Sequence, residues 1–460
     1  MVTLDNWALF HIIYNTDLLK IKKNTIIFVV RLVYISKYYY FCGKFRNRLE
    51  MVRKLYTMRD FSNSMGTDIL TQCRDFQKFV DQANSFGHQG YWVMSNSGVG
   101  ATMCLEEDGK CVSAFISNDY LGMSQRQETK QAGIDALLKY GTGACAAQAI
   151  GGYLDIHRRL EMSIADFTGQ EDAILFSSGF GANTGLLRAI LGKDDIAYID
   201  SFIHTSALSG LRGTTIKHIG HNDVNYLDMI LSADKGKYVT SVVIIDGVYS
   251  QDGDLSMLPE YVEVCRKHGC LLIMDDAHGM GVMGMSGRGT AEYFDCLGKV
   301  DIITGTCSKS FGCVGGFVAA SKKIIQYLRY YADSNVFSAA MTPQVAGSVL
   351  KAIEIIKNEP QVRQQLWSNV NYLREKLKER QFDIGKSVTP IFPVMVRDNL
   401  KVYQVAEELR KREIFASGIV YPAVRTKEAR IRISILATHE KWQLDHLVNS
   451  LTEIRNIVSF

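Results

Sequence analysis

The 460-residue chain lacks several features that mark particular protein classes. Its ten cysteines include no CxxC pair and no Cys/His cluster at zinc-ligand spacing, which excludes the common zinc modules. The charge is nearly balanced, with 52 basic and 48 acidic side chains, so nothing indicates nucleic acid as a partner. Only six prolines are present, and they form no proline-rich linker. We therefore expect reduced thiols in a cytoplasmic protein, most of them filling the core, and no metal.

The first 57 residues differ in composition from the rest. Residues 24–41, NTIIFVVRLVYISKYYYF, are apolar and aromatic, but Arg31 and Lys37 interrupt them. No uncharged stretch therefore reaches the roughly 18 residues of a membrane-spanning helix. We predict that residues 1–57 are a poorly ordered or non-native extension, with a later methionine as the true start. The alternative is an interfacial amphipathic anchor, that is, a peripheral contact with a membrane.

From about residue 110 the pattern indicates an α/β architecture. Short apolar runs alternate with longer amphipathic stretches, as in a parallel sheet covered by helices on both faces. Six runs predict strands, at residues 172–178, 195–201, 241–247, 270–276, 300–306 and 316–321. Beyond residue 348 the chain becomes helical, with a 3.6-residue period over 364–381, followed by strand candidates at IFPVMVR and ARIRISIL.

These patterns predict how the chain after residue 57 is divided. Residues 58–110 are expected to form an N-terminal arm that completes a smaller domain. Residues 111–340 are expected to form the large α/β domain, and residues 341–460 a smaller α+β domain.

Polar residues follow the predicted strands, and in an open parallel sheet such residues gather at the carboxyl edge. Ser178, Gly179 and Phe180 come at the end of the first run, His204 follows the second, and Ser250 follows the third. Asp275 and His278 come at the end of the fourth run, and Thr306, Ser308 and Lys309 at the end of the fifth. Each signal alone is weak, because a lone lysine after a strand is usually a surface residue. The turn GFGANTG also departs from dinucleotide-loop spacing, although a small-residue turn into a helix can bind any phosphate.

The combination of these residues indicates a pyridoxal-phosphate site. The aldehyde of this cofactor needs a lysine amine for a Schiff base, and the amine is a useful nucleophile only if burial lowers its pKa. The pyridine nitrogen needs a carboxylate beside it to remain protonated. Lys309 and Asp275, which follow successive strands, are the candidates for these two tasks.

The same residues resemble a known family. DDAHGMGVMGMSGRG (275–289) followed by TGTCSKSFGCVGG (304–316) resembles the α-oxoamine synthases, which include 8-amino-7-oxononanoate synthase, glycine C-acetyltransferase, serine palmitoyltransferase and 5-aminolevulinate synthase. The likeness runs from SNDYLGM (117–123) to ARIRISILATHE (429–440), about three quarters of the chain. It implies a fold type I pyridoxal-phosphate enzyme, with a mostly parallel seven-stranded sheet in the large domain and a smaller α+β C-terminal domain.

The resemblance implies roles for the catalytic residues. Lys309 resembles the Schiff-base lysine, and Asp275 resembles the partner of the pyridine nitrogen. His204 is similar to the histidine that stacks on one face of the ring, with Ala277 against the other face. His278 resembles a group near the phenolic oxygen of the ring.

The resemblance also implies binding roles. Ser250 is similar to a second group near the phenolic oxygen. The implied phosphate cradle consists of Ser178, Gly179, Phe180, Thr306 and Ser308. Arg432 resembles the arginine that takes the carboxylate of the amino acid, since its planar fork suits a bidentate pair, and Asn118 resembles a residue at the substrate mouth.

The implied reaction joins an amino acid to an acyl thioester, on CoA or on an acyl-carrier protein, with loss of CO2 to give an α-amino ketone. Lys309 would remove the Cα proton, and His204 would hydrogen-bond the incoming carbonyl. The alternatives are a class I/II aminotransferase and a non-catalytic cofactor-binding regulator. The regulator would need a DNA-reading domain, and the N-terminal segment shows no helix-turn-helix pattern.

Two positions depart from the family pattern. Gln148 stands where many relatives have arginine, and Tyr153 where many have threonine. Both changes are expected to alter the acyl or amino-acid pocket, so serine, alanine, glycine and cysteate all stay open as substrates. The family also implies a homodimer with a shared site, in which part of NVFSAAMTP (335–343) reaches the neighbour's phosphate.

Overall fold

A computed structural model of the chain describes residues 68–85, 92–106 and 109–460. The predictions for residues 1–57 and 24–41 lie outside the described residues. The chain divides into two compact units, Met1–Gln82 and Ala83–Phe460. Helix α4 (Ile69–Ser85) begins in the first unit, where Asp68 accepts hydrogen bonds from Leu70 N and Thr71 N. Among the described residues, no helix combines the length and the apolar character needed to span a bilayer.

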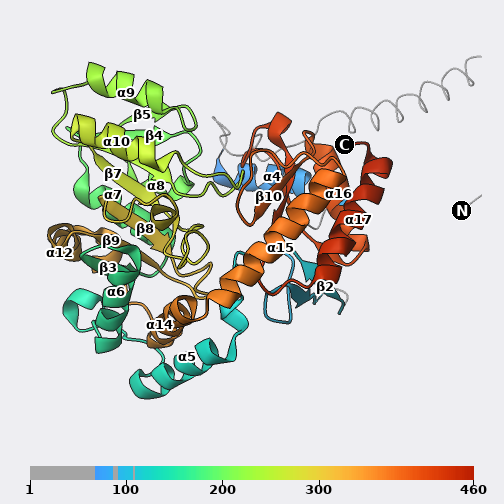
Figure 1. Cartoon of the computed structure of the whole chain (residues 1–460), viewed down its shortest axis with the longest axis horizontal. Coiled ribbons are helices and arrows are strands. Elements are labelled where there is room, and N and C mark those ends of the chain that lie inside the picture. The colour runs from blue at the N-terminus through green and yellow to red at the C-terminus, as the bar shows by residue number, and fades with distance from the viewer. Residues whose placement is uncertain (1–67, 86–91, 107–108) are drawn as a thin grey trace, which may run out of the picture. The chain divides into compact units, whose positions relative to one another are not determined.

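A seven-stranded sheet forms the core of the larger part of the second unit, which lies at the left in Figure 1. Its order is β3 (Asp172–Phe176), β9 (Gly316–Ala320), β8 (Ile302–Thr306), β7 (Leu271–Asp275), β6 (Ser241–Asp246), β4 (Ile196–Asp200) and β5 (Thr215–Ile219). Strand β9 runs antiparallel to both of its neighbours, and the pairs from β8 to β5 are parallel. All six predicted strands are present. The sequence does not reveal β5, because Lys217 and His218 break its apolar pattern at the edge of the sheet.

The two faces of this sheet supply two hydrophobic cores. In β3, Ile174 and Phe176 pack with α7 (Gly179–Ile190) and α12 (Lys322–Tyr331), whereas Ala173 and Leu175 face the opposite core. The other helices of this part are α5 (Gln127–Tyr140), α6 (Asp155–Thr168), α8 (Thr205–Gly210), α9 (Val224–Ala233), α10 (Leu258–His268), α11 (Thr290–Tyr293), α13 (Asp333–Val336) and α14 (Pro343–Asn358). Each buried aliphatic side chain contributes about 1.5–3 kcal/mol.

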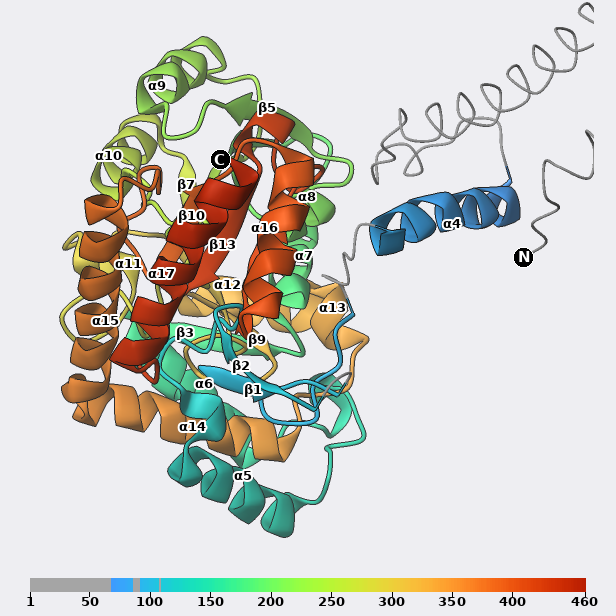
Figure 2. The same ribbon diagram turned by 90° about the vertical axis from the view of Figure 1, so that its right-hand side faces the viewer.

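Two small sheets complete the second unit. Strands β10 (Ile391–Met395), β13 (Arg430–Ser434) and β12 (Ser417–Ile419) are antiparallel. Helices α15 (Pro360–Glu379), α16 (Asn399–Lys411) and α17 (Lys441–Val458) lie against them (Figure 2). Strand β2 (Cys111–Ala114) pairs with both β1 (Thr102–Cys104) and β11 (Ile414–Phe415), so residues before 115 share a sheet with the C-terminal part. The domain boundaries themselves stay a prediction.

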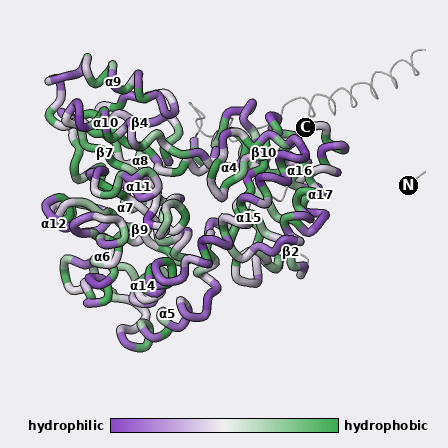
Figure 3. The backbone as a smooth tube through the Cα atoms, viewed as in Figure 1, coloured by the Kyte–Doolittle hydropathy of each residue, from purple (hydrophilic) through white to green (hydrophobic). Residues whose placement is uncertain are grey.

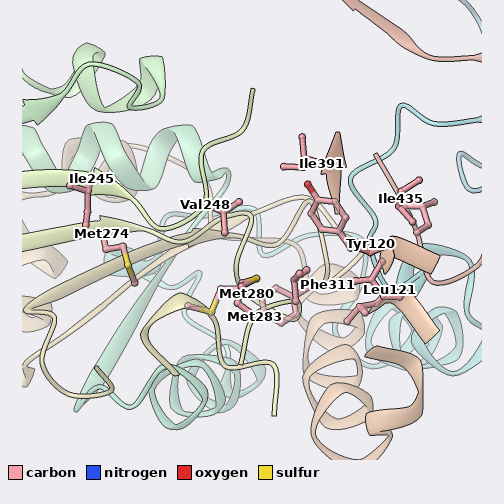
Figure 4. Packing of buried hydrophobic residues seen from close by; sticks show 14 of the residues in the cluster. Tyr120, Leu121, Ile245, Val248, Met274, Met280, Met283, Phe311, Ile391 and Ile435 are labelled. Atoms are coloured by element: carbon pink, nitrogen blue, oxygen red, sulfur yellow. The ribbon is translucent and has the colours of Figure 1, made fainter. Parts of the chain in front are cut away.

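One apolar cluster connects the large sheet with β10. Figure 4 shows it extending from Ile245 and Met274 on the large sheet toward Phe311, Tyr120 and Ile391. Figure 3 shows hydrophilic residues concentrated on outer helices such as α5 and α12. The continuous cluster holds the carboxyl edge of the large sheet close to β10 and β13, which is where the candidate site lies.

The prediction that all cysteines are reduced is wrong for one pair. Cys104 of β1 lies directly opposite Cys111 of β2, and the two residues form a disulfide. The pair has no CxxC spacing, because the register of the hairpin and not closeness in sequence brings these side chains together. The seven other described cysteines are free, and Cys265, Cys270, Cys296 and Cys307 are buried in the core as expected.

Candidate active site

A pocket of about 300 Å³ lies at the carboxyl edge of the large sheet. Its walls come from the ends of β6, β7 and β8 and from the segments that follow β3 and β4. The lining residues are Ser178, Gly179, Phe180, Asn183, His204, Ser206, Asp246, Val248, Ser250, Asp275, Ala277, His278, Gly305, Thr306, Ser308 and Lys309. All residues predicted to bind the cofactor are in this set. The structure therefore brings them together, while their individual roles stay predictions.

Lys309 follows β8 and lies in the wall of the pocket. Burial lowers its pKa to about 8, since the charged ammonium is poorly solvated there. The Asp275 carboxylate opposes this shift, and the nearby Arg432 cation reinforces it. About a tenth of the Lys309 amines are consequently uncharged at pH 7, far more than for an ordinary lysine, and the uncharged amine is the nucleophilic form of the group.

Asp275 at the end of β7 is held by two donors. Ala277 N donates to Asp275 Oδ1 at 3.0 Å, and Asn183 Nδ2 donates to Asp275 Oδ2 at 2.7 Å. Both hydrogen bonds fix the orientation of the carboxyl group in the pocket wall. Sequence reasoning missed Asn183, although it lies one turn beyond Gly179 in α7 and so on the same side of the helix.

A hydrogen-bond chain orients His204, which caps α8. Asn183 Nδ2 also donates to Ser206 Oγ at 2.8 Å, and Ser206 Oγ lies 2.7 Å from His204 Nδ1. Ser206 N is a second donor to this Nδ1, at 3.3 Å. The Nδ1 atom is therefore an acceptor. Burial lowers the pKa of His204, although Asp275 raises it in part, so the neutral ring is favoured. Because Nδ1 accepts hydrogen bonds, the neutral ring carries its proton on Nε2.

The first turn of α7 provides a candidate phosphate cradle. Ser178 Oγ accepts a hydrogen bond from Gly181 N, and this cap leaves the preceding N–H groups of Gly179 and Phe180 without intrahelical partners. Across the pocket, Thr306 Oγ1 lies 2.8 Å from Ser308 Oγ. A Cβ at position 179 would lie 2.9 Å from Thr306 Cβ, so only glycine permits this approach. Free amides, hydroxyls and a helix N-terminus suit a phosphate group.

His278 and Tyr120 form a buried pair beside the pocket. Tyr120 Oη lies 2.7 Å from His278 Nδ1, and it also donates to Asn118 Oδ1 at 3.3 Å. Burial, together with the Lys309 and Arg432 cations, holds the pKa of His278 well below its usual range. Burial raises the pKa of Tyr120 to about 12. Both groups are therefore neutral at physiological pH.

Arg432 on β13 connects the smaller sheet to this edge. Its Nε donates to the Ser250 carbonyl at 2.7 Å, Nη1 to Ser434 Oγ at 2.7 Å and Nη2 to Asn118 Oδ1 at 3.2 Å. These three bonds use three of its five N–H groups. Asn118 and Arg432 do not line the pocket themselves, but Ser250 and the Tyr120–His278 pair connect them to it.

Asp246 is a second pocket carboxylate that sequence reasoning missed. It ends β6 directly opposite Asp275 on β7, so both side chains emerge on the same face of the sheet. Burial and the Asp275 charge raise the pKa of Asp246 well above its usual range. Its Oδ1 accepts a long hydrogen bond from His204 N at 3.5 Å. Burial thus favours the protonated form of Asp246, and an aspartate that ends an apolar run was its sequence signal.

The neighbouring Asp276 is fully buried and does not line the pocket. Thr290 donates to it from Oγ1 at 2.6 Å and from N at 2.7 Å. A Cβ on Gly247, Gly279 or Gly289 would lie within 2.4 Å of its carboxylate oxygens. Burial raises the pKa of Asp276 to about 7. The Asp276 carboxyl group therefore stabilises the turn that follows β7, with Thr290 and three glycines packed around it.

The two positions that depart from the family pattern lie outside this pocket. Tyr153 Oη donates to Glu161 Oε2 at 2.5 Å, and Arg329 lies over the Tyr153 ring. Neither Gln148 nor Tyr153 is a lining residue. Their expected effect on substrate choice stays a prediction. The described residues contain no group of three or more His, Cys, Asp or Glu side chains arranged for a metal ion.

Residues 112–451 match the family described as aminotransferase class I and II. The chain is 40% identical to a serine palmitoyltransferase of Sphingobacterium spiritivorum, over 75% of this chain and 87% of the relative. It is 38% identical to an 8-amino-7-oxononanoate synthase of Thermoanaerobacter pseudethanolicus, over 75% of this chain and 88% of the relative.

Solved structures agree with these relatives. The Sphingomonas wittichii serine palmitoyltransferase superposes with a TM-score of 0.81 at 26% identity, covering 85% of this chain and 99% of that one. A serine palmitoyltransferase solved with PLP gives 0.80 at 28% identity, covering 85% and 100%. The predicted family and fold are confirmed: the chain belongs to the α-oxoamine synthases within the class I and II aminotransferase family and has the fold of a type I pyridoxal-phosphate enzyme.

Proposed function

We propose that this chain is a pyridoxal-phosphate-dependent C-acyltransferase that condenses an amino acid with an acyl thioester and releases CO2. The observation that carries the proposal is the convergence of the Lys309 amine, the Asp275 carboxylate and the first turn of α7 in one pocket. Relatives of both kinds, 8-amino-7-oxononanoate synthases and serine palmitoyltransferases, match at 36–40% identity, which supports the reaction class they share.

The pocket fits pyridoxal phosphate by its donor set. The N–H groups and hydroxyls around Gly179 and Thr306 suit the phosphate. Asp275, whose two carboxyl oxygens each accept a hydrogen bond, suits a protonated pyridine nitrogen. Lys309 would hold the aldehyde carbon through Nζ, and the depressed pKa of this amine favours that bond. When bound, the cofactor supplies an electron sink that makes the Cα–H bond of the amino acid acidic.

The residues around the cofactor position would handle the substrate. Lys309 Nζ takes the proton from Cα, since it is the basic group in the pocket wall with a pKa near working pH. The two remaining N–H groups of Arg432 hold the substrate carboxylate until it leaves as CO2. His204 Nε2–H would donate to the thioester carbonyl oxygen, where negative charge develops as the Cα of the amino acid forms the new carbon–carbon bond. The carbonyl forms again when the carbon–sulfur bond breaks and the thiol leaves.

The products distinguish this reaction from transamination. The purified protein, incubated with serine, alanine or glycine and an acyl-CoA or acyl-carrier protein, is expected to release free thiol and CO2 in equal amounts. A 2-oxo acid formed without thiol release would identify an aminotransferase instead. The homodimer, the cytoplasmic location and the peripheral membrane contact stay predictions. The exposed aromatic residues Tyr330, Tyr331 and Phe337 support the homodimer, since a partner subunit could cover them.

The pKa of Lys309 predicts how the cofactor loads. Because the free amine is the reactive form and its pKa is about 8, the rate at which apoprotein takes up pyridoxal phosphate should rise about tenfold from pH 7 to pH 9 and then level off. Stopped-flow absorbance of cofactor uptake measures this rate. A rate that stays flat across this range would contradict a buried, titrating Lys309.

The two pocket carboxylates should respond differently to amide substitution. Burial favours the protonated form of Asp246, which an amide resembles in shape and charge, so Asp246→Asn should change the affinity for pyridoxal phosphate less than about threefold. Asp275→Asn removes the charge beside the pyridine nitrogen and should weaken the affinity by about 2–4 kcal/mol. Equilibrium dialysis of both variants measures the difference. Equal losses would mean that Asp246 carries negative charge in the working protein.

A further inference from the structure

His221, behind the pocket, lies between two carboxylates. Its Nδ1 lies 3.1 Å from Asp200 Oδ1, and its Nε2 lies 2.8 Å from Asp254 Oδ2. Asp200 is fully buried, and Asp254 is 8% exposed. Carboxylate oxygens accept hydrogen bonds, so with an aspartate side chain at each ring nitrogen the doubly protonated imidazolium, which donates from both nitrogens, fits this site.

The surroundings keep this cation in place. The Phe202 ring stacks on His221 with centroids 4.3 Å apart, and the Tyr249 ring meets it edge-on at 4.4 Å. Burial opposes the charge, but the hydrogen bonds to Asp200 and Asp254 outweigh it and raise the pKa of His221 to about 9. The titratable groups that face this cation are therefore the two carboxylates and Tyr249, with Tyr261 behind Asp200 at 3.4 Å.

The cation connects two segments of the candidate site. Asp200 ends β4, four residues before His204, and its Oδ1 accepts from Phe202 N at 2.8 Å. Asp254 closes a turn over residues 249–254, since Tyr249 N donates to Asp254 O at 3.0 Å and Gly253 N to Tyr249 O at 2.9 Å. Asp254 Oδ1 is buried without a hydrogen-bond partner among the described residues, so His221 is the group that balances this carboxylate.

The 249–254 turn also holds Arg432, the proposed ligand of the substrate carboxylate. Arg432 Nε donates to the Ser250 carbonyl in this turn, and Arg430 Nη1 donates to the Asp252 carboxylate at 2.7 Å. At the far end of the turn, Thr389 Oγ1 donates to the Gly253 carbonyl at 2.8 Å. Displacement of the turn would therefore move the acceptor that fixes the guanidinium plane of Arg432.

We propose that His221 is a positioning residue whose positive charge fixes the 249–254 turn and, through the Ser250 carbonyl, the Arg432 guanidinium that binds the amino-acid carboxylate. The inference rests on the proposed function, because it needs Arg432 to be the carboxylate ligand. Below the pKa of His221 the cation holds Asp254. As the pH rises above about 9 the ring loses one proton, one carboxylate loses its donor, and amino-acid binding weakens.

The test compares His221→Gln with wild type as holoenzymes between pH 7.5 and 10. The amino-acid Kd is read from the visible absorbance of bound cofactor. Glutamine is neutral throughout, so at pH 7.5 the variant's Kd should be about three- to tenfold higher, the factor expected for one hydrogen bond. The ratio of variant to wild-type Kd should fall toward one above pH 9.5, because wild-type His221 is then neutral too. The amino group of the substrate and Lys309 titrate in both proteins and cancel in the ratio.

Asp254→Asn provides a second variant if His221→Gln does not fold. Because one opposite charge is removed, amino-acid binding by Asp254→Asn should weaken at a pH about 1–3 units lower than binding by wild type. Asp228→Asn is the matched control, because Asp228 pairs with His268 at 2.6 Å outside this turn, and its profile should equal wild type. A Kd ratio that stays constant with pH, or an unshifted Asp254→Asn profile, would overturn the inference. Unchanged binding in Arg432→Ala would overturn the proposed carboxylate ligand, and this inference with it.

Discussion

Lys309→Ala is expected to yield a folded protein that shows no visible absorbance band from bound pyridoxal phosphate. The condensation rate should fall by about a thousandfold or more, because the variant loses both the attachment point of the cofactor and the base for the Cα proton. The pocket should otherwise persist, since Lys309 packs at its wall while β8 and the turn back into β9 are held by backbone bonds such as Cys307 N to Gly315 O. Absorbance spectra and thiol-release rates measure the two effects.

Lys322→Ala is the matched control for this result. Lys322 begins α12 with an exposed side chain, so its removal should leave both the spectrum and the rate unchanged. A Lys309→Ala protein with the wild-type visible band would show that another amine holds the cofactor. Loss of activity in both variants would indicate a general effect of removing a lysine.

Arg432→Ala is expected to weaken amino-acid binding by about 2–4 kcal/mol, roughly 30- to 800-fold in Kd. The side chain is 7% exposed and is fixed by Ser250, Ser434 and Asn118, so it is a preorganised fork with two N–H groups left for the substrate. Cofactor affinity should change less than threefold, because Arg432 does not line the pocket. Separate titrations with pyridoxal phosphate and with amino acid measure the two affinities.

Two further variants make the Arg432 result specific. Arg432→Lys keeps the charge but has no planar fork, so its amino-acid affinity should lie between wild type and Arg432→Ala. Arg425→Ala removes an exposed arginine before the same strand and should match wild type. Equal losses of cofactor and amino-acid affinity in Arg432→Ala would mean that the arginine is structural.

The sequence predicted those parts of the fold that follow from local pattern. The buried strands read as apolar runs, and the residues directly after them, such as Asp275 and Lys309, could be assigned to one edge of the sheet. Strand β5 was not predictable in this way, because an edge strand with Lys217 and His218 has no continuous apolar run. The disulfide depends on the cross-strand register of β1 and β2, which sequence spacing alone does not determine.

The residues that support the site from behind were harder to predict. Asn183 and Ser206 lie inside helices, and their role follows only from the geometry that joins Asp275 to His204. Asp246 ends a strand as Asp275 does, but no motif shows that burial raises the pKa of Asp246 or that the register of β6 against β7 places the two side chains opposite each other. The environment of His221 likewise depends on three loops that are distant in sequence.

The central claim is a covalent bond between Lys309 and pyridoxal phosphate. Borohydride reduction of the holoenzyme, followed by proteolysis and mass spectrometry, locates that bond directly. The account predicts a phosphopyridoxyl group on the peptide that contains Lys309 and on no other lysine. A modified lysine elsewhere, or a protein that takes up no cofactor before reduction, would contradict it.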